Sequence, residues 1–226
     1  MRGCDCLSHP RRAHRLHDEV QDESLDVWQR LLELIEEAII SEDAEFAPGR
    51  SLRDHGWEQV VTLPPSVGRL TSVEHLDLYR SNLVRLPPEI GNMTALTTFT
   101  PYTSHRLHWF PYELTRCPAL ANSTVSTRAI YGNSKNRMTF PSLRRKAGND
   151  PVLARACTGK CSICRVAVVD VTRARWISLR VATDVLPLLL FACSPECLAK
   201  VGKSPDNYPS GPHAGGQIKQ PPPYWG

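Results

Sequence analysis

The residues of this chain that are best suited to chemistry are two pairs of cysteines. Two residues separate Cys161 from Cys164, and three residues separate Cys193 from Cys197. Four thiolates with this spacing can form a tetrahedral sulfur site, which suits Zn²⁺ with Zn–S bonds of about 2.3 Å. A site closed by four protein ligands leaves no position for water or substrate. We therefore predict a structural zinc site, and the strongest motif of the chain argues against an enzyme.

The remaining cysteines leave alternatives open. Cys157 lies four residues before Cys161 and would take the place of one ligand if the pairing were displaced. Alternatively, the cysteines are reduced core residues, which pack as small apolar side chains. Cys4 and Cys6 form a third pair on a polar arm where we do not expect ligation, and Cys117 lies in a repeat turn where we expect a structural role.

Composition narrows the class of protein. The chain has 226 residues and a net charge of +4, which is too mild by itself to indicate a nucleic-acid partner. Residues 1–23 contain no apolar run of the length that a secretory signal needs. The longest later run, residues 185–193, is far shorter than the about 20 residues that span a membrane. We therefore expect a cytoplasmic protein without a membrane partner, whose reduced thiols are free to bind metal.

The sequence around the cysteines predicts the elements that bring them together. Three runs typical of strands follow Cys164, and they cover residues 165–171, 176–181 and 186–192. Ser194 and Pro195 then form a strong helix start, so that a short helix carries Cys197. A knuckle, a hairpin and a helix with the second ligand pair, in this order, resemble a treble-clef zinc finger. The resemblance implies a small α+β zinc-binding module over residues 157–203.

The middle of the chain repeats itself. The motif Leu63-Pro-Pro-Ser-Val-Gly-Arg-Leu70 recurs at offsets of 23 and 24 residues, beginning at Leu86 and, in decayed form, at Phe110. A period in the twenties is typical of a solenoid with one short strand in each turn. Residues 57–133 resemble bacterial leucine-rich repeat proteins of the LPxxIGxL type. The resemblance implies a curved parallel sheet on the concave side and Pro-rich turns or 3₁₀ segments on the convex side.

The repeats depart from the family pattern at one position. Where such repeats usually carry Asn, this chain has Ser81, Ser104 and Arg128, and only Asn82 stands one place later. The usual Asn ties the turns to backbone through an internal ladder of side chains. We therefore expect this ladder to be weakened here.

The segment before the repeats predicts a helix that covers their first end. Apolar residues recur at three- and four-residue spacing from Leu25 to Ile39, and Ser24 is the expected N-cap. Trp57 with residues 60–61 is expected to add a transitional strand. The fold class is therefore α/β, a short leucine-rich repeat solenoid with an N-terminal capping helix and the zinc module. The predicted division is a disordered arm (1–23), the capping helix (24–47), the solenoid (48–133), a linker (134–156), the zinc module (157–203) and a Pro/Gly-rich tail (204–226).

Side chains that flank the inward leucines of each predicted strand point outward on the concave face. Tyrosines among small hydroxyl side chains are typical of recognition surfaces, because Tyr offers contact area at low entropy cost. An ordinary solvated sheet face is the alternative. The predicted partner-binding residues are His75, Asp77, Tyr79, Thr98, Thr100, Tyr102, Asn122, Thr124 and Ser126.

These features favour a non-catalytic module that binds a protein partner through the concave strands, the zinc module or both. His75 and Asp77 share a face and could act as a base and its orienter, but no Ser or Cys nucleophile stands at a recognisable turn. The alternative is a nucleic-acid-associated zinc protein with a basic C-terminal surface. Its candidate residues are Arg144, Arg145, Lys146, Arg165, Arg173, Arg175 and Arg180.

Overall fold

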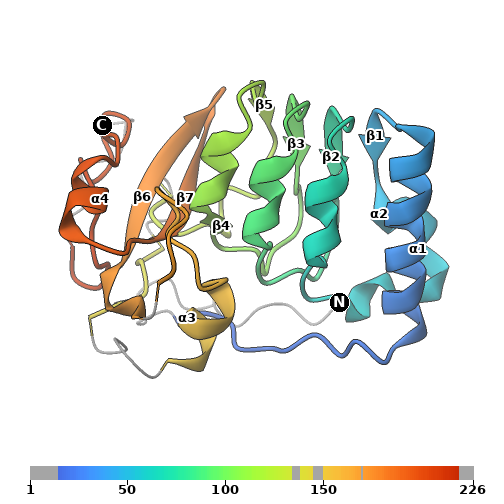
Figure 1. Ribbon diagram of the computed structural model, residues 1–226, viewed down its shortest axis with the longest axis horizontal. Helices are drawn as coiled ribbons and strands as arrows, with labels where there is room; N and C mark the ends of the chain where they lie inside the picture. The colour runs from blue at the N-terminus through green and yellow to red at the C-terminus, as the bar shows by residue number, and fades with distance from the viewer. Residues whose placement is uncertain (1–14, 134–137, 145–149, 169, 219–226) are drawn as a thin grey trace.

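A four-stranded parallel sheet runs through the first half of the computed structural model, which describes residues 15–133, 138–144, 150–168 and 170–218 (Figure 1). The strand order is β1-β2-β3-β5. Each strand is short, and neighbours pair in register, as His75 with Thr98 and Thr98 with Asn122. The strands are β1 (Glu45–Phe46), β2 (His75–Asp77), β3 (Thr98–Thr100) and β5 (Asn122–Ser123).

A 3₁₀ helix begins each repeat and stacks on the next one. The three helices are η4 (Pro65–Arg69), η5 (Pro88–Asn92) and η6 (Tyr112–Arg116), and they begin 23 and 24 residues apart, as the sequence repeat does. A Cβ atom on Gly68 would lie 2.6 Å from the carbonyl oxygen of Glu89, and one on Gly91 would lie 2.3 Å from that of Glu113. The repeated glycine is therefore needed because neighbouring turns approach through their backbones.

Buried serines connect two of the turns. The hydroxyl of Ser81 donates to Oγ of Ser104 over 2.8 Å, and the Ser104 hydroxyl donates to the carbonyl of Leu78, also over 2.8 Å. The amide of Ser81 also donates to Oγ of Ser104. At the position usually held by Asn, the chain thus keeps a ladder of hydroxyl groups.

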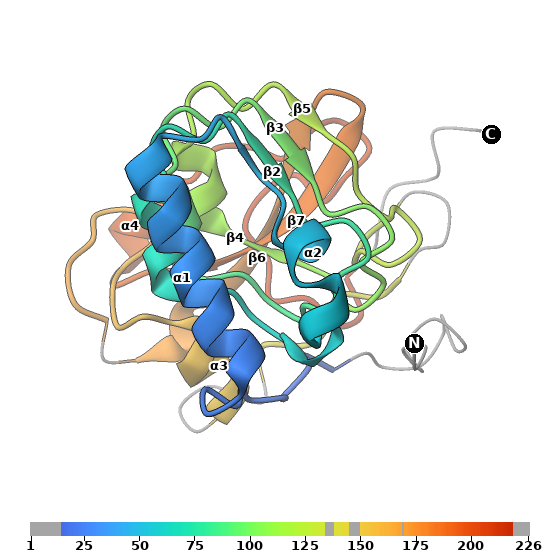
Figure 2. The same ribbon diagram turned by 90° about the vertical axis from the view of Figure 1, so that its right-hand side faces the viewer.

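The first end of the stack is covered by helix α1 (Asp26–Ser41), which lies across it in Figure 2. Its buried face carries Trp28, Leu31 and Ile35, as the apolar spacing predicts. The predicted N-cap is wrong, because the Ser24 hydroxyl donates to the carboxylate of Asp22 instead. Two elements near this end have other positions than we expected. The strand added to the sheet is β1 and not residues 57–61. After β1 come helix α2 (Pro48–Ser51) and the 3₁₀ helices η2 (Arg53–His55) and η3 (Trp57–Gln59).

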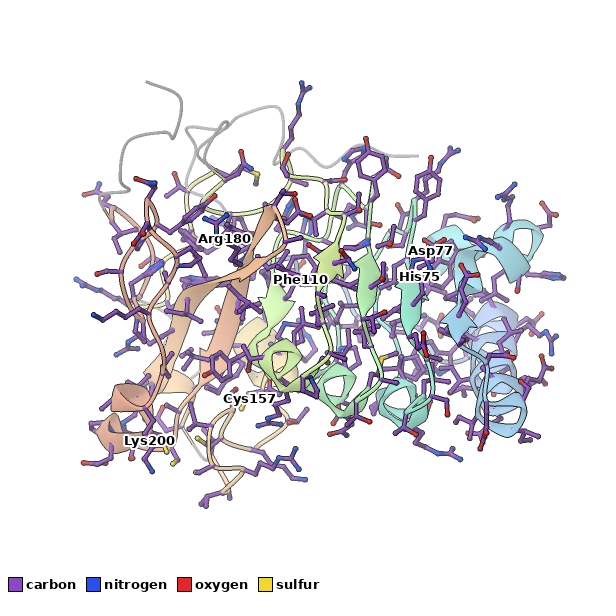
Figure 3. All side chains as sticks on the ribbon, turned by 90° about the horizontal axis from the view of Figure 1, so that it is seen from above. His75, Asp77, Phe110, Cys157, Arg180 and Lys200 are labelled. Carbon is purple, nitrogen blue, oxygen red and sulfur yellow. The ribbon has the colours of Figure 1, made fainter. Side chains whose placement is uncertain are left out.

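A second, mixed sheet continues the fold toward the C-terminus. The hairpin β6 (Ala174–Val181) and β7 (Asp184–Phe191) is antiparallel, and β7 also pairs in parallel with β4 (Phe110–Pro111). Phe110 lies where the repeats meet this sheet (Figure 3). The first strand predicted after Cys164 is not a sheet strand. Its residues 165–168 pass through a turn with one isolated bridge, and 171–173 form the 3₁₀ helix η7.

The segment predicted as a linker instead helps to build a second core beneath the hairpin. Trp176 is fully buried there, and its indole Nε1 donates to the carbonyl of Pro141 over 3.0 Å. Helix α3 (Pro151–Ala156) packs into the same core and begins at Asp150, whose carboxylate accepts the amides of Val152 and Leu153. The other buried side chains come from segments far apart in sequence: Leu16, Trp109, Tyr131, Met138, Phe140, Leu143, Leu189 and Phe191.

The described part of the predicted N-terminal arm, residues 15–23, is packed along the molecule. The side chain of Gln21 accepts the amide of Val61 over 2.8 Å, and the Arg85 guanidinium donates to the carbonyl of Glu19. Its polar composition therefore did not mean disorder, because its backbone and side chains supply partners to the repeats and to α3. The predictions for Cys4, Cys6, Arg145 and Lys146, and for the last eight residues of the tail, lie outside the described residues.

Among the described residues, we find no helix that is both long enough and apolar enough to cross a membrane.

Candidate functional site

Four cysteine sulfurs converge at the end of the second sheet. The Sγ atoms of Cys161, Cys164, Cys193 and Cys197 all lie within 4.8 Å of one another, and two of the neighbouring pairs are 3.5 Å apart. A tetrahedral ion with Zn–S bonds of about 2.3 Å would hold its four sulfurs about 3.8 Å apart. The group that the sequence predicted is therefore assembled at a spacing that could hold a metal ion.

A tight turn presents the first pair of cysteines. The amide of Cys161 donates to the carbonyl of Val166 over 2.8 Å, and the amide of Arg165 donates back to the carbonyl of Cys161 over 2.9 Å. Arg165 has a backbone angle φ of 64°, which lies in the left-handed region where residues other than glycine are strained. This turn leaves Cys161 buried and Cys164 exposed.

Helix α4 (Pro195–Ala199) presents the second pair as predicted. The hydroxyl oxygen of Ser194 caps it by accepting the amide of Cys197 over 3.3 Å, and Pro195 occupies the first turn. Cys193 lies just before the cap and Cys197 within the helix. The helix start thus fixes the separation of the two sulfurs.

The four thiols differ in how easily they lose a proton. Burial opposes ionisation of Cys161, but the amides of Cys164, Ile163 and Cys193 donate to its sulfur and lower its pKa to about 6. Hydrogen bonding to the sulfurs of Cys164 and Cys197 raises the pKa of Cys193 to about 12. Four crowded thiolates repel one another, so the whole set ionises together only when a cation neutralises it.

Cys157 does not belong to this cluster. It lies directly after α3, half-buried, and burial raises the pKa of its thiol. Cys117 is also separate, because its thiol donates to the carbonyl of Ile90 between two repeat turns. Burial raises the pKa of Cys117 to about 11, as expected for a structural residue.

The cysteine turn is tied to the rest of the molecule by residues that the sequence pattern did not single out. The amide and hydroxyl of Ser162 both bond to the backbone of Phe191 at the end of β7. The guanidinium of Arg116, in the last repeat turn, donates to the carbonyl of Ser162 over 2.6 Å. Ser162 and Arg116 bond to backbone atoms that are distant in sequence. No residue spacing in the sequence could therefore have identified these two residues.

Five of the nine predicted partner-binding residues lie in strands β2, β3 and β5, and the other four, Tyr79, Tyr102, Thr124 and Ser126, follow the ends of these strands. Seven of the nine reach solvent, whereas Asp77 and Ser126 are buried. Tyr79 and Tyr102 stack with ring centroids 6.2 Å apart, and each is 46% exposed. Such a stack leaves a rigid aromatic surface in contact with water, where it can bind another surface.

His75 and Asp77 lie next to each other on β2 but do not pair (Figure 3). The His75 ring hydrogen-bonds the hydroxyl of Thr100 over 2.9 Å, while the Asp77 carboxylate accepts from the guanidinium of Arg50 over 2.8 Å. Arg50 also pairs with Glu45 over 3.0 Å. Asp77 therefore pairs with Arg50, and the carboxylate that faces the His75 ring is that of Glu45, with its oxygen 3.5 Å from Nδ1.

The hairpin closes the far edge of this sheet. The carboxylate of Asp184 accepts from the hydroxyl of Ser123 and from the amide of Val125, each over 3.0 Å. Burial raises the pKa of Asp184. A carboxylate from the second sheet thus satisfies the last strand, which would otherwise present an unpaired edge.

The structural likeness to known proteins is weak. No family model matches the chain, and no curated protein matches it. A solved leucine-rich repeat protein of Leptospira interrogans is similar over 34% of this chain, at 22% identity and a TM-score of 0.27. The chain spans about a fifth of the length of that protein, since the match covers 20% of it. The likeness concerns the fold alone and is weak at this score.

Proposed function

We propose that this chain is a protein-binding module, built as a short leucine-rich solenoid of the LPxxIGxL type and closed by a structural zinc site. Its binding surface is the open face of the parallel sheet. The stacked pair Tyr79 and Tyr102 carries the proposal, because two exposed aromatic rings are held rigidly among hydroxyl side chains. Its activity is binding and not turnover, and its location is the cytoplasm, where thiols stay reduced.

Three features of the sheet face support this function. Its rows come from successive repeats in register, so one extended partner can contact several turns at once. The same strands and their ends carry the short polar side chains of Thr98 and Thr124, which reach solvent and can offer hydrogen bonds. The imidazole of His75 is held between the Thr100 hydroxyl and the Glu45 carboxylate, so it presents a fixed polar group on the same face.

The zinc site has a structural role in this proposal. Four thiolates would fill the coordination sphere of Zn²⁺, leaving no open position for chemistry. Cys161 and Cys164 on a turn, the β6–β7 hairpin and α4 with Cys197 follow one another as in a treble clef. The metal would fasten this module onto the last repeat turn, next to the contact between Arg116 and Ser162.

The alternative nucleic-acid function has less support, because two of its candidate arginines hydrogen-bond backbone carbonyls of the protein through one guanidinium nitrogen. The guanidinium of Arg173 donates to the carbonyl of Cys193, and that of Arg175 donates to the carbonyls of Thr172 and Ala174. Arg144, Arg165 and Arg180 remain exposed. Three exposed arginines neutralise few phosphates.

The binding face is tested with a double variant, Tyr79→Ala with Tyr102→Ala. Partners enriched from cell extract on the full-length chain are identified, purified and measured again by titration against wild type and variant. We expect the double variant to weaken binding by about tenfold or more, because exposed aromatic residues carry much of the free energy of an interface.

The matched control removes two exposed apolar side chains elsewhere, Ile40→Ala with Val166→Ala. This control should leave the affinity of the purified partner unchanged. Equal affinity of the partner for wild type and for the tyrosine variant would contradict the proposed face. A partner lost only in the control would move the site to α1 or to the cysteine turn.

A further inference from the structure

A polar pocket lies on the C-terminal half, and its lining includes neither the sheet-face residues nor the cysteines. It has a volume of about 730 Å³. Three segments meet there, and none of the side chains that line it is a carboxylate. The residues that matter are Ser142 and Arg144 from the loop before α3, Thr172 and Arg175 from the start of the hairpin, and His213 with Gly215 and Gly216 from the C-terminal segment.

Two arginines give this pocket its charge. One nitrogen of the Arg175 guanidinium donates to the carbonyls of Thr172 and Ala174, over 3.1 and 2.7 Å, which orients the group and leaves its other donors available. Arg144 is exposed and pairs with no carboxylate in the described part of the chain. The pocket therefore attracts anions, and planar guanidinium groups match the geometry of phosphate oxygens.

His213 adds a buried donor to the same wall. Its Nδ1 accepts the amide of Gly215 over 3.2 Å, and its ring packs edge-on against Phe140 with centroids 4.7 Å apart. Burial lowers the pKa of His213 to about 4, so the ring is neutral near pH 7. A neutral ring that accepts at Nδ1 carries its proton on Nε2. This buried N–H has no acceptor among the described residues.

The C-terminal segment passes close to the loop through two glycines with positive φ. Gly215 and Gly216 have φ of 68° and 73°. A Cβ atom on Gly215 would lie 2.2 Å from the carbonyl oxygen of Pro141, so no other residue fits without a shift. The wall here is backbone, with the hydroxyl-bearing Ser142 beside it.

We infer that this pocket binds the phosphate group of a small ligand, either inorganic phosphate or a phosphate monoester. Arg144 and Arg175 supply the positive charge, and Ser142 and His213 line the same pocket. No carboxylate is among the lining residues, and that of Asp170 accepts the hydroxyl of the lining residue Thr172. The inference is independent of the proposed protein-binding face, since the two sites share no residue. It assigns a ligand to a part of the molecule that the proposed function leaves unused.

Phosphate binding is tested on the full-length, zinc-loaded protein. Inorganic phosphate is titrated at constant ionic strength against chloride, with calorimetry and with the ¹⁵N resonances of the imidazole of His213 as readouts. We expect saturable binding that shifts these resonances. Arg144→Gln should weaken it by about tenfold, because a charge-assisted hydrogen bond is lost. Arg144 is exposed and without an ion pair, so this variant should fold as the wild type does.

Arg180→Gln is the matched control, because Arg180 is an exposed arginine on β6 outside the pocket (Figure 3). It should bind phosphate as the wild type does. Adenosine monophosphate, used as a second probe, separates the two sources: tighter binding than inorganic phosphate indicates a monoester, and equal binding indicates the free ion.

Three results would overturn the inference. The first is that phosphate causes no more change than chloride. The second is that Arg180→Gln weakens binding as much as Arg144→Gln. The third is that a single-stranded oligonucleotide binds where neither phosphate nor the nucleotide does. The last result would indicate an extended nucleic-acid surface instead of a pocket. Loss of the sheet-face partner in the tyrosine variant tests only the proposed function, so the two can fail separately.

Discussion

The repeat turns between Leu63 and Cys117 stack mainly on their immediate neighbours, whereas the second core joins segments far apart in sequence. Ser81 bonds to Ser104 in the next turn, but Trp176 packs against the rings of Trp109, Tyr131 and Phe140. Contacts between neighbouring repeats make nearly additive contributions to stability. We find no such ladder among the described residues of the second half, so we expect this half to form as one unit, with the cysteine cluster at its end.

The largest effect should come from the second half. We expect Trp176→Ala to lower the free energy of unfolding by about 3–5 kcal/mol, because it empties the centre of the second core. Denaturant unfolding measures this loss. Val166→Ala, at a side chain that is 60% exposed, should cost almost nothing. A loss below about 1 kcal/mol for Trp176→Ala would mean that this core is not a cooperative unit.

A change of one methyl group should disturb the repeats through their backbones. Gly91→Ala places a Cβ atom 2.3 Å from the carbonyl oxygen of Glu113, so the turns must separate. We expect a loss of about 1–3 kcal/mol by thermal or denaturant unfolding. Gly202→Ala is the control, because no atom lies within 4 Å of the added group. Equal stability of the two variants would show that the turns are not closely stacked.

The hydroxyl ladder should contribute less than the glycine contacts. Ser104→Ala leaves the amide of Ser81 without its acceptor and should cost about 1–2 kcal/mol. Hydrogen exchange at Ser81 should increase in the same variant. Ser72→Ala, at an exposed position, is the comparison and should be neutral. If exchange at Ser81 is unchanged, the serines do not replace the usual Asn ladder.

The smallest expected effect is a gain in stability at the cysteine turn. Arg165 has φ of 64°, so Arg165→Gly relieves strain but adds entropy to the unfolded chain. We expect a net gain of about 0.5 kcal/mol. Arg165→Lys keeps a side chain at the same backbone angle, so the backbone strain remains and stability should not change. A loss in the glycine variant would mean that the Arg165 side chain itself stabilises the turn.

The parts that sequence could predict are those set by local rules. The repeat period follows from Gly68 and Gly91, and the start of α4 follows from Ser194 and Pro195. The cysteine group follows from ligand spacing. Helix α1 was predicted by its apolar face, although its N-cap was not, because Asp22 competes for Ser24.

The parts that sequence could not predict depend on long-range contacts. The run after Cys164 has the composition of a strand, but the bond from Cys161 to Val166 folds it into a turn. The expected linker has few apolar residues, yet Phe140 and Leu143 are buried because Trp176 needs partners. The burial of Asp77 depends on Arg50, which lies 27 residues away. No local pattern in the sequence contains these pairs.

The measurement that tests the account most directly is the metal content of the purified protein per chain, by elemental analysis. We predict one zinc ion in the wild type and none in Cys193→Ser with Cys197→Ser. The matched control, Cys117→Ala with Cys157→Ala, should keep its zinc, because both residues lie outside the cluster. A wild type without metal after purification under reducing conditions would contradict the account, as would a control that loses its zinc.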